Sequence, residues 1–215
     1  MSSKNKRAYE FLRGRLFDGF YSFGEAVSVR TISKEIGVSR QPIMTALYRL
    51  AEQGFIDITA QVGCRVANPA LQDVLDFYEV FAAVESVVAG FAAQRATAAE
   101  LERLEDINRQ ILALDVGSVH VVKDYQRLNQ HFHQALHECA HSSRIAAQQQ
   151  INFDLSDFYL IQTKSFKDNL LTAGMEHDRI IKALRKRNKN QAQKLSKEHI
   201  LSVAQHIQVY WQQKN

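Results

Sequence analysis

Three histidines on three separate stretches of helical sequence form the first candidate site of this 215-residue chain. His133 lies on the border of the apolar stripe of residues 118–140, and Asn129 lies within that stripe one turn earlier. His177 and His199 fall on the apolar faces of two later helical stretches. A polar side chain on an inward face costs roughly 2–7 kcal/mol unless something pairs with it. The arrangement therefore predicts either hydrogen-bonded core residues or ligands of a shared ion.

Imidazole binds zinc, nickel, copper and iron well, and three imidazoles leave coordination positions open for water or an anion. We therefore expect a divalent metal ion here, with zinc or nickel as the first candidates. Two alternatives stay open from the residues alone: core histidines around a metal-free pocket, or a metal-dependent hydrolase in which the ion activates water. Against hydrolysis, Glu176 and Glu198 directly precede His177 and His199, so they should point about 100° away from them.

The elements that must position these histidines are helices. From Leu71 onward the hydrophobic pattern predicts six of them, over 71–95, 98–114, 118–140, 143–165, 168–188 and 190–213. A helical bundle of this size usually holds its ligands between facing helices. On the third helix we expect His131 to point away from the core, and His137 and His141 to lie progressively nearer to solvent.

The second candidate site lies in residues 30–54, which predict two short helices separated by a Gly-Val turn, the pattern of a helix-turn-helix. We expect Ser39 to cap the second helix by accepting a backbone hydrogen bond, and Pro42 is tolerated in its first turn. The second helix then begins with Ser39, Arg40 and Gln41, side chains that a recognition helix offers to base edges and phosphates in the major groove. The pattern predicts DNA binding.

The flanking sequence extends this motif. Residues 4–17 predict a preceding helix, and two short apolar stretches joined at Gly63 predict a β-hairpin wing whose tip, residues 61–65, can approach the minor groove or the DNA backbone. The expected fold is thus mostly α. A winged helix-turn-helix domain occupies residues 1–68, and an all-helical domain, to which the family resemblance given below assigns effector binding and dimerisation, occupies residues 69–215.

Charge and cysteine usage agree with a DNA-binding regulator in the cytoplasm. Residues 1–68 hold 10 Lys and Arg against 6 Asp and Glu, whereas residues 69–215 hold 17 against 17, so the excess positive charge lies in the first domain. Cys64 and Cys139 lack the spacing of a zinc or redox motif, and the polar start is not a secretory signal. The most apolar run, residues 80–93, is shorter than the roughly 20 residues of a membrane span.

Together the two halves resemble the GntR superfamily of bacterial transcription regulators, specifically the FadR subfamily with its FCD effector domain. The strongest element is Ile-Gly-Val-Ser-Arg-Gln-Pro-Ile-Met-Thr-Ala-Leu-Tyr-Arg-Leu at 36–50, followed by Gln-Gly-Phe-Ile at 53–56 and the wing glycine Gly63. In the second half the similar segments are 128–133, 176–184 and 197–200. The resemblance covers nearly the whole chain.

The resemblance implies a homodimeric regulator, usually a repressor, that binds a pseudo-palindromic DNA operator and responds to a small-molecule effector. It implies a metal site made of Asn129, His133, His177 and His199. It also implies DNA contacts from six positions: Arg30, Ser39, Arg40, Gln41, Pro42 and Gly63.

Three positions depart from the family pattern. Met44 replaces an arginine of the recognition helix and cannot make a bidentate contact, so either operator preference should differ or affinity should be lower. Phe81 replaces an arginine that pairs with carboxylate effectors, so the effector pocket should suit a different ligand. Asn129 replaces an aspartate; its amide oxygen can still coordinate, but the loss of one negative charge should either weaken metal binding or make a bound anion more important.

Overall fold

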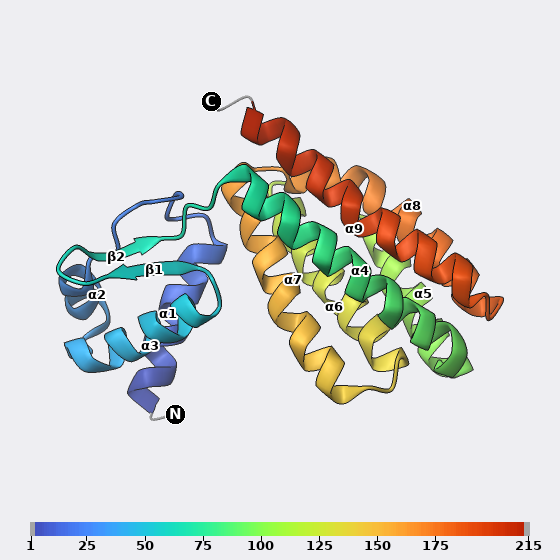
Figure 1. Ribbon diagram of the computed structural model, residues 1–215, viewed down its shortest axis with the longest axis horizontal. Coiled ribbons are helices and arrows are strands. Elements are labelled where there is room, and N and C mark those ends of the chain that lie inside the picture. The colour runs from blue at the N-terminus through green and yellow to red at the C-terminus, as the bar shows by residue number, and fades with distance from the viewer. Residues whose placement is uncertain (1–2, 213–215) are drawn as a thin grey trace. The chain divides into compact units, whose positions relative to one another are not determined.

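The computed structural model describes residues 3–212, apart from the side chains of residues 167, 168 and 171, and it divides into two compact units (Figure 1). The first unit contains the residues up to Pro69 together with Leu155–Gln162, and the second contains Ala70–Asp154 and the residues from Thr163 onward. The sequence assigns 155–162 to the second domain, whereas the structure groups this segment with the first unit. One helix therefore contributes to both units.

The first unit has the helix-turn-helix order that the sequence predicts. Its elements are α1 (Ser3–Phe17), α2 (Val29–Ile36), α3 (Arg40–Glu52), β1 (Ile56–Thr59) and β2 (Gly63–Val66). Ser28 caps α2 because its side-chain oxygen accepts a hydrogen bond from the backbone N–H of Thr31 at 3.2 Å. Gly37 ends α2 in the left-handed conformation, with φ of 60°, which glycine adopts without strain.

The two strands form the predicted wing. They pair antiparallel, with Ile56 opposite Val66 and Thr59 opposite Gly63. At the start of β2, Gly63 has φ of 119°, a conformation that side chains with a Cβ rarely adopt. Helices α1 and α3 pack against each other over an apolar core. Its fully buried large side chains include Leu12, Leu16, Ile32, Ile43, Leu47, Leu50 and Phe55.

After Pro69 the described chain is helical, and the predicted fold class is confirmed. The elements are α4 (Leu71–Arg95), α5 (Ala98–Leu112), α6 (Val121–Cys139), α7 (Ser143–Thr163), α8 (Phe166–Arg185) and α9 (Lys189–Gln212). Prediction and structure agree at both ends of α4. The third helix begins at Val121 rather than 118 because the preceding residues form a turn in which the N–H of Ser118 donates to the carbonyl of Asp115. The predicted end of the last helix at 213 lies outside the described residues.

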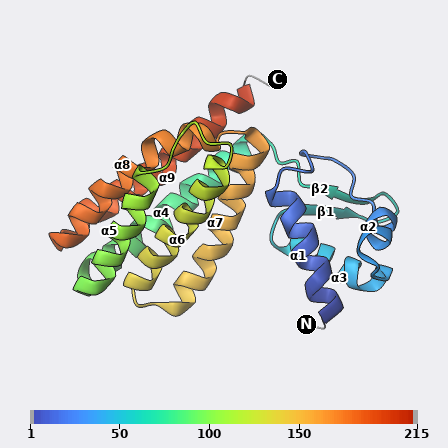
Figure 2. The same ribbon diagram turned by 180° about the vertical axis from the view of Figure 1, so that it is seen from behind.

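Helix packing in the second unit brings α6, α8 and α9 together. α4 packs along α9, and the approach is close at Gly90, where a Cβ atom would lie 2.9 Å from Cγ of Gln193. α4 also contacts α6 and α8, while α8 contacts both α6 and α9. Seen from behind, α5 and α6 lie side by side (Figure 2), and α5 also packs on α8. The three helices with inward-facing histidines therefore share one interior.

Both cysteines are buried free thiols. Burial raises the pKa of each, that of Cys139 to about 12, which leaves them protonated and unreactive at neutral pH. Within residues 3–212, none of the helices combines the length and apolarity that a membrane span requires.

Candidate metal centre and nucleic-acid interface

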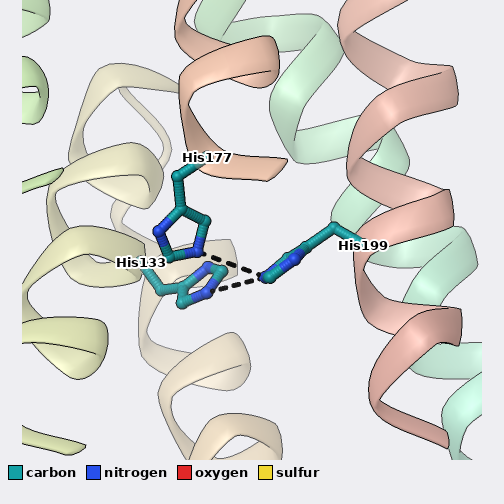
Figure 3. Close-up of side chains that lie close together, drawn as sticks. All are labelled: His133, His177 and His199. Carbon is teal, nitrogen blue, oxygen red and sulfur yellow. Dashed lines mark hydrogen bonds between the residues drawn. The ribbon is translucent and has the colours of Figure 1, made fainter. Parts of the chain in front are cut away.

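The three histidines meet in the interior of the helical unit, each from a different helix (Figure 3). The Nε2 atom of His199 on α9 lies 3.3 Å from Nε2 of His177 on α8 and 3.3 Å from Nε2 of His133 on α6. Each side chain is at most 3% exposed. Tetrahedral zinc with Zn–N distances of about 2.0–2.1 Å places its nitrogen ligands about 3.3–3.4 Å apart. The imidazole spacing fits such an ion.

Aromatic rings fix the orientation of two of these imidazoles. The ring of Phe132 stacks on His177 with 3.8 Å between centroids, and the ring of Phe153 stacks on His133 at 4.1 Å. These contacts restrict ring rotation, so the nitrogens stay directed at one another. Phe153, on α7, is a contributor that the sequence pattern alone does not reveal.

Burial keeps His133 and His177 in the neutral protonation state in which an imidazole can bind a metal. It lowers the pKa of His133 and of His177 well below the usual value near 6.5, and the neighbouring imidazoles lower both further. A neutral imidazole offers a lone pair, whereas imidazolium offers none. The Nδ1 atoms of both residues, on the side of each ring away from the clustered Nε2 atoms, are buried without a hydrogen-bond partner among the described residues.

Glu176 orients the third imidazole. Its carboxylate accepts a hydrogen bond from Nδ1 of His199 at 2.7 Å and another from the hydroxyl of Ser202 at 3.1 Å. Burial alone would raise the pKa of Glu176, but these hydrogen bonds and the imidazole charge lower it. In the neutral tautomer of His199 that carries its proton on Nδ1, this hydrogen bond leaves Nε2 free to present its lone pair to the cluster.

The contact between Glu176 and His199 is one that the sequence misses, because it links α8 to α9. Glu176 does diverge from His177, its neighbour on α8, yet it reaches an imidazole on the adjacent helix. The carboxylate lies at Nδ1, on the side of the ring away from the clustered Nε2 atoms. It therefore orients the His199 ring and lies outside the cluster of Nε2 atoms.

Asn129 lies one turn before His133 and is buried. Its Oδ1 atom accepts a hydrogen bond from the hydroxyl of Tyr125 at 3.4 Å, and that hydroxyl accepts one from Nδ2 of Asn169 at 2.9 Å. The long first bond leaves the amide oxygen weakly held. Asn129 is thus joined to a polar chain that runs between α6 and α8.

The expectation for His137 is wrong. This side chain is only 2% exposed, and its Nε2 atom lies 3.0 and 3.1 Å from the two carboxylate oxygens of the fully buried Glu85 on α4. α4 covers this side of α6, so the buried face of α6 is wider than its apolar stripe. The sequence does contain one signal for this pair: Glu85 is an acid within an apolar run, and a buried acid needs a buried partner. His131 and His141 are exposed, as expected.

Phe81 is buried against the same aromatic cluster. Its ring meets that of Phe153 edge to face, with centroids 4.8 Å apart, and Phe153 in turn stacks on His133. The residue that replaces the family arginine therefore lies one aromatic ring away from the histidines. Next to them it contributes an apolar surface rather than a cation.

The predicted DNA contacts gather on the first unit. Ser39, Arg40 and Gln41 are exposed at the start of α3, and Arg30 is exposed in the first turn of α2. Ser39 occupies the N-cap position, but its side chain makes no capping hydrogen bond, so that expectation is wrong. The reason is Pro42, which occupies the third helical position and has no N–H to donate. The hydroxyl of Ser39 thus remains available to a ligand.

The wing is exposed to solvent as well. Gly63 and the neighbouring turn are exposed, with 67% of Val62 accessible to solvent. Burial raises the pKa of the Cys64 thiol on β2, while the positive charge of Arg40 opposes that shift. Arg40, at the start of α3, therefore lies close enough to the hairpin to act electrostatically on Cys64.

Two family descriptions match this chain. Residues 4–66 match the family described as "Bacterial regulatory proteins, gntR family", and residues 76–202 match the FCD domain. The HTH-type transcriptional regulator YdhC of Bacillus subtilis (strain 168) is 26% identical over 200 residues, covering 92% of this chain and 86% of YdhC. The HTH-type transcriptional repressor RspR of Escherichia coli (strain K12) is 30% identical over 137 residues, covering 63% of this chain and 59% of RspR.

The solved structures that resemble this chain show the same fold. A GntR transcriptional regulator from Rhodococcus sp. RHA1 superposes with a TM-score of 0.76 at 20% identity, over 96% of this chain and 98% of that one.

Proposed function

Because this chain belongs to the GntR-type transcription regulators that carry an FCD domain, we propose that it binds a pseudo-palindromic operator as a homodimer under the control of a metal-dependent effector site. The regulator is a DNA-binding protein and not an enzyme. A two-fold dimer presents two recognition helices, which matches two symmetric half-sites. The description of RspR as a repressor supports repression as the mode of action.

For DNA recognition we assign α3 to the major groove. Arg40 and Gln41 supply base or phosphate contacts, and the uncapped Ser39 hydroxyl supplies a phosphate contact. Arg30 on α2 and Gly63 in the wing contact the backbone on either side. Pro42 fixes the first turn of α3.

For the effector domain we assign a divalent ion, zinc or nickel, to His133, His177 and His199. The observation that carries this assignment is the 3.3 Å separation of Nε2 of His199 from Nε2 of His177 and from Nε2 of His133 in a buried cluster. Asn129, one turn from His133, is the proposed fourth ligand through its amide oxygen. When bound, the ion would supply a Lewis-acidic position for an effector with an oxygen or nitrogen donor.

The aromatic neighbours of the cluster set the class of effector. Phe81 and Phe153 offer apolar contacts at the place where the family pattern has a carboxylate-binding arginine. The part of the effector that does not bind the ion is therefore uncharged or apolar. The effector regulates DNA binding only if it binds the DNA-binding arrangement of the dimer and the arrangement that does not bind DNA with unequal affinity. The alternative is the same fold with a metal-free pocket.

The test combines operator selection with metal analysis of the full-length protein. Selection from a random duplex DNA library should enrich an inverted repeat, and enrichment of a single unrepeated motif would contradict dimeric recognition. Protein reloaded with Zn²⁺ or Ni²⁺ and then dialysed should retain close to one ion per chain by mass spectrometry. Absence of retained metal would overturn the metal assignment and favour the metal-free pocket.

The orienting role of Glu176 gives this test a second readout. Glu176→Gln keeps the shape of the side chain but weakens the hydrogen bond to His199, so zinc affinity should fall about 10–100-fold. Glu198→Gln, one residue before His199 but exposed, is the matched control and should bind zinc like the parent.

A further inference from the structure

The outer face of α3 continues for two turns beyond Ser39 and Arg40. The buried side chains of this helix all lie on one side of it: Ile43, Ala46, Leu47 and Leu50. At 3.6 residues per turn, the opposite side carries Gln41, Met44, Thr45 and Tyr48. Tyr48 is 56% exposed, and Met44 and Thr45 are half-buried. The face that starts with the proposed DNA contacts therefore extends along the helix.

Beyond the first turn this face has little polar chemistry to offer. Residues 41–48 contain no Lys, Arg, Asp or Glu. The guanidinium carbon of Arg49, the next residue, lies 4.3 Å from the ring centroid of Tyr9 on α1, and this cation–π contact holds it against α1. The hydroxyl of Thr45 donates to the backbone carbonyl of Gln41 at 3.1 Å, so its proton is already used within the helix. The face is thus without a cation and poor in donors.

Met44 is the apolar side chain at the centre of this face. It lies one turn after Arg40 and three residues after Gln41, beside the side chains that we assign to base edges and phosphates. A thioether donates no hydrogen bond and accepts only weakly, so Met44 cannot select a base pair through hydrogen bonds. In the major groove, thymine is the base that presents an apolar group, its 5-methyl, to such a side chain. The flexible methionine can adapt its shape to that group.

We infer that Met44 contacts the 5-methyl group of one thymine in each operator half-site and thereby selects an A·T pair at that position. The inference rests on the proposed function, because it requires α3 to lie in the major groove of a two-fold operator. Arg40 and Gln41 then make the polar contacts at the start of the helix, and Met44 reads a neighbouring base pair by apolar contact alone.

The test removes the methyl group and nothing else. Each thymine of a selected operator half-site is replaced in turn by deoxyuridine, and the affinity of the full-length protein is measured by fluorescence anisotropy. At one position the parent should bind about fourfold more weakly, and about 15-fold more weakly when both half-sites are changed, as expected for the transfer of one methyl group per half-site. Met44→Ala should bind the thymine and uracil duplexes with equal affinity. Met175→Ala, at a 59% exposed methionine of α8, is the matched control and should keep the parent's ratio.

A base exchange gives a second readout. In Met44→Arg the guanidinium can donate to O6 and N7 of guanine, so selection with this variant should replace the A·T pair by G·C at the same position. The comparison of two duplexes on one protein sample is insensitive to partial unfolding, because an unfolded fraction lowers both apparent affinities equally. Thermal melting identifies a variant that fails to fold.

The outcomes separate the base contact from operator binding. If the parent binds its selected operator but no thymine-to-uracil change weakens binding, or if Met44→Ala retains the parent's ratio, Met44 does not read a methyl group and the proposed function stands. An A·T preference that persists in Met44→Arg would likewise assign that base to another side chain. A parent that enriches no duplex from the library would overturn the proposed operator binding together with this inference.

Discussion

The DNA-binding surface and the histidine cluster differ in how their residues are assembled. Ser39, Arg40 and Gln41 are consecutive and exposed, so one helix start positions all of them. The histidines lie on three helices, with His133 and His199 separated by 66 positions in the chain, and all three are buried. The first site needs only local structure, whereas the second needs correct packing of α6, α8 and α9. The cluster should therefore be the more sensitive of the two to substitution and to pH.

The largest expected effect is loss of the metal site. His133→Ala removes one of three converging nitrogens, so zinc affinity should fall by more than about 100-fold, beyond the effect of changing an orienting residue. His131→Ala, on the same helix but exposed, is the matched control and should retain one ion per chain. Isothermal titration with Zn²⁺ measures both. Equal affinities in the two variants would contradict the cluster as the metal site.

The next effect is acid destabilisation of the metal-free protein. The pKa values of His133 and His177 are lowered by burial in the folded chain, whereas the unfolded chain titrates near 6.5 and binds more protons below that pH. The free energy of unfolding should thus fall as pH drops below about 6.5, by up to about 1.4 kcal/mol per pH unit for each histidine. Urea unfolding in chelator at several pH values measures the slope. His177→Phe should reduce the slope of the free energy of unfolding against pH. An unchanged slope would show that the buried histidines do not cause the acid destabilisation.

A smaller effect is expected at the DNA surface. Arg40→Ala removes an exposed donor at the start of α3, which should weaken operator binding by about 1–3 kcal/mol if Arg40 reads a base. Fluorescence anisotropy with selected and scrambled duplexes measures both affinities. An equal loss on the two duplexes would make Arg40 a phosphate contact, and no loss on either would remove it from the interface. Stability and zinc content should be unchanged.

The smallest effect compares two serines at helix starts. Ser28→Ala removes a capping hydrogen bond and should lower the free energy of unfolding by about 1 kcal/mol. Ser39→Ala removes no cap, so stability should change by less than about 0.5 kcal/mol while operator affinity falls. Thermal unfolding and anisotropy distinguish the two roles. A Ser39→Ala variant as destabilised as Ser28→Ala would show that the hydroxyl does cap α3.

The features that could be predicted from the sequence follow the same division between local structure and the packing of distant helices. Periodic apolar residues specify α4 and the other helices, and inward-facing positions select the three clustered histidines. The pairing of Glu176 with His199 and of Glu85 with His137 could not be predicted, because each joins two helices whose relative rotation depends on the whole bundle. The missing cap at Ser39 follows from Pro42, a local detail that the motif itself contains.

The division of α7 between the two units bears on how the DNA-binding domain could be excised. Within the first unit, the ring of Phe158 meets those of Phe55 and Phe23 at 5.3 and 5.7 Å, and the side chain of Gln162 donates to the backbone carbonyl of Tyr21 at 2.9 Å. A gene fragment that stops at Pro69 would encode a winged domain with an uncovered aromatic surface. Although this domain is nearly contiguous in the gene, a chimera that transplants it must also supply a substitute for eight residues from the C-terminal part of a distant helix.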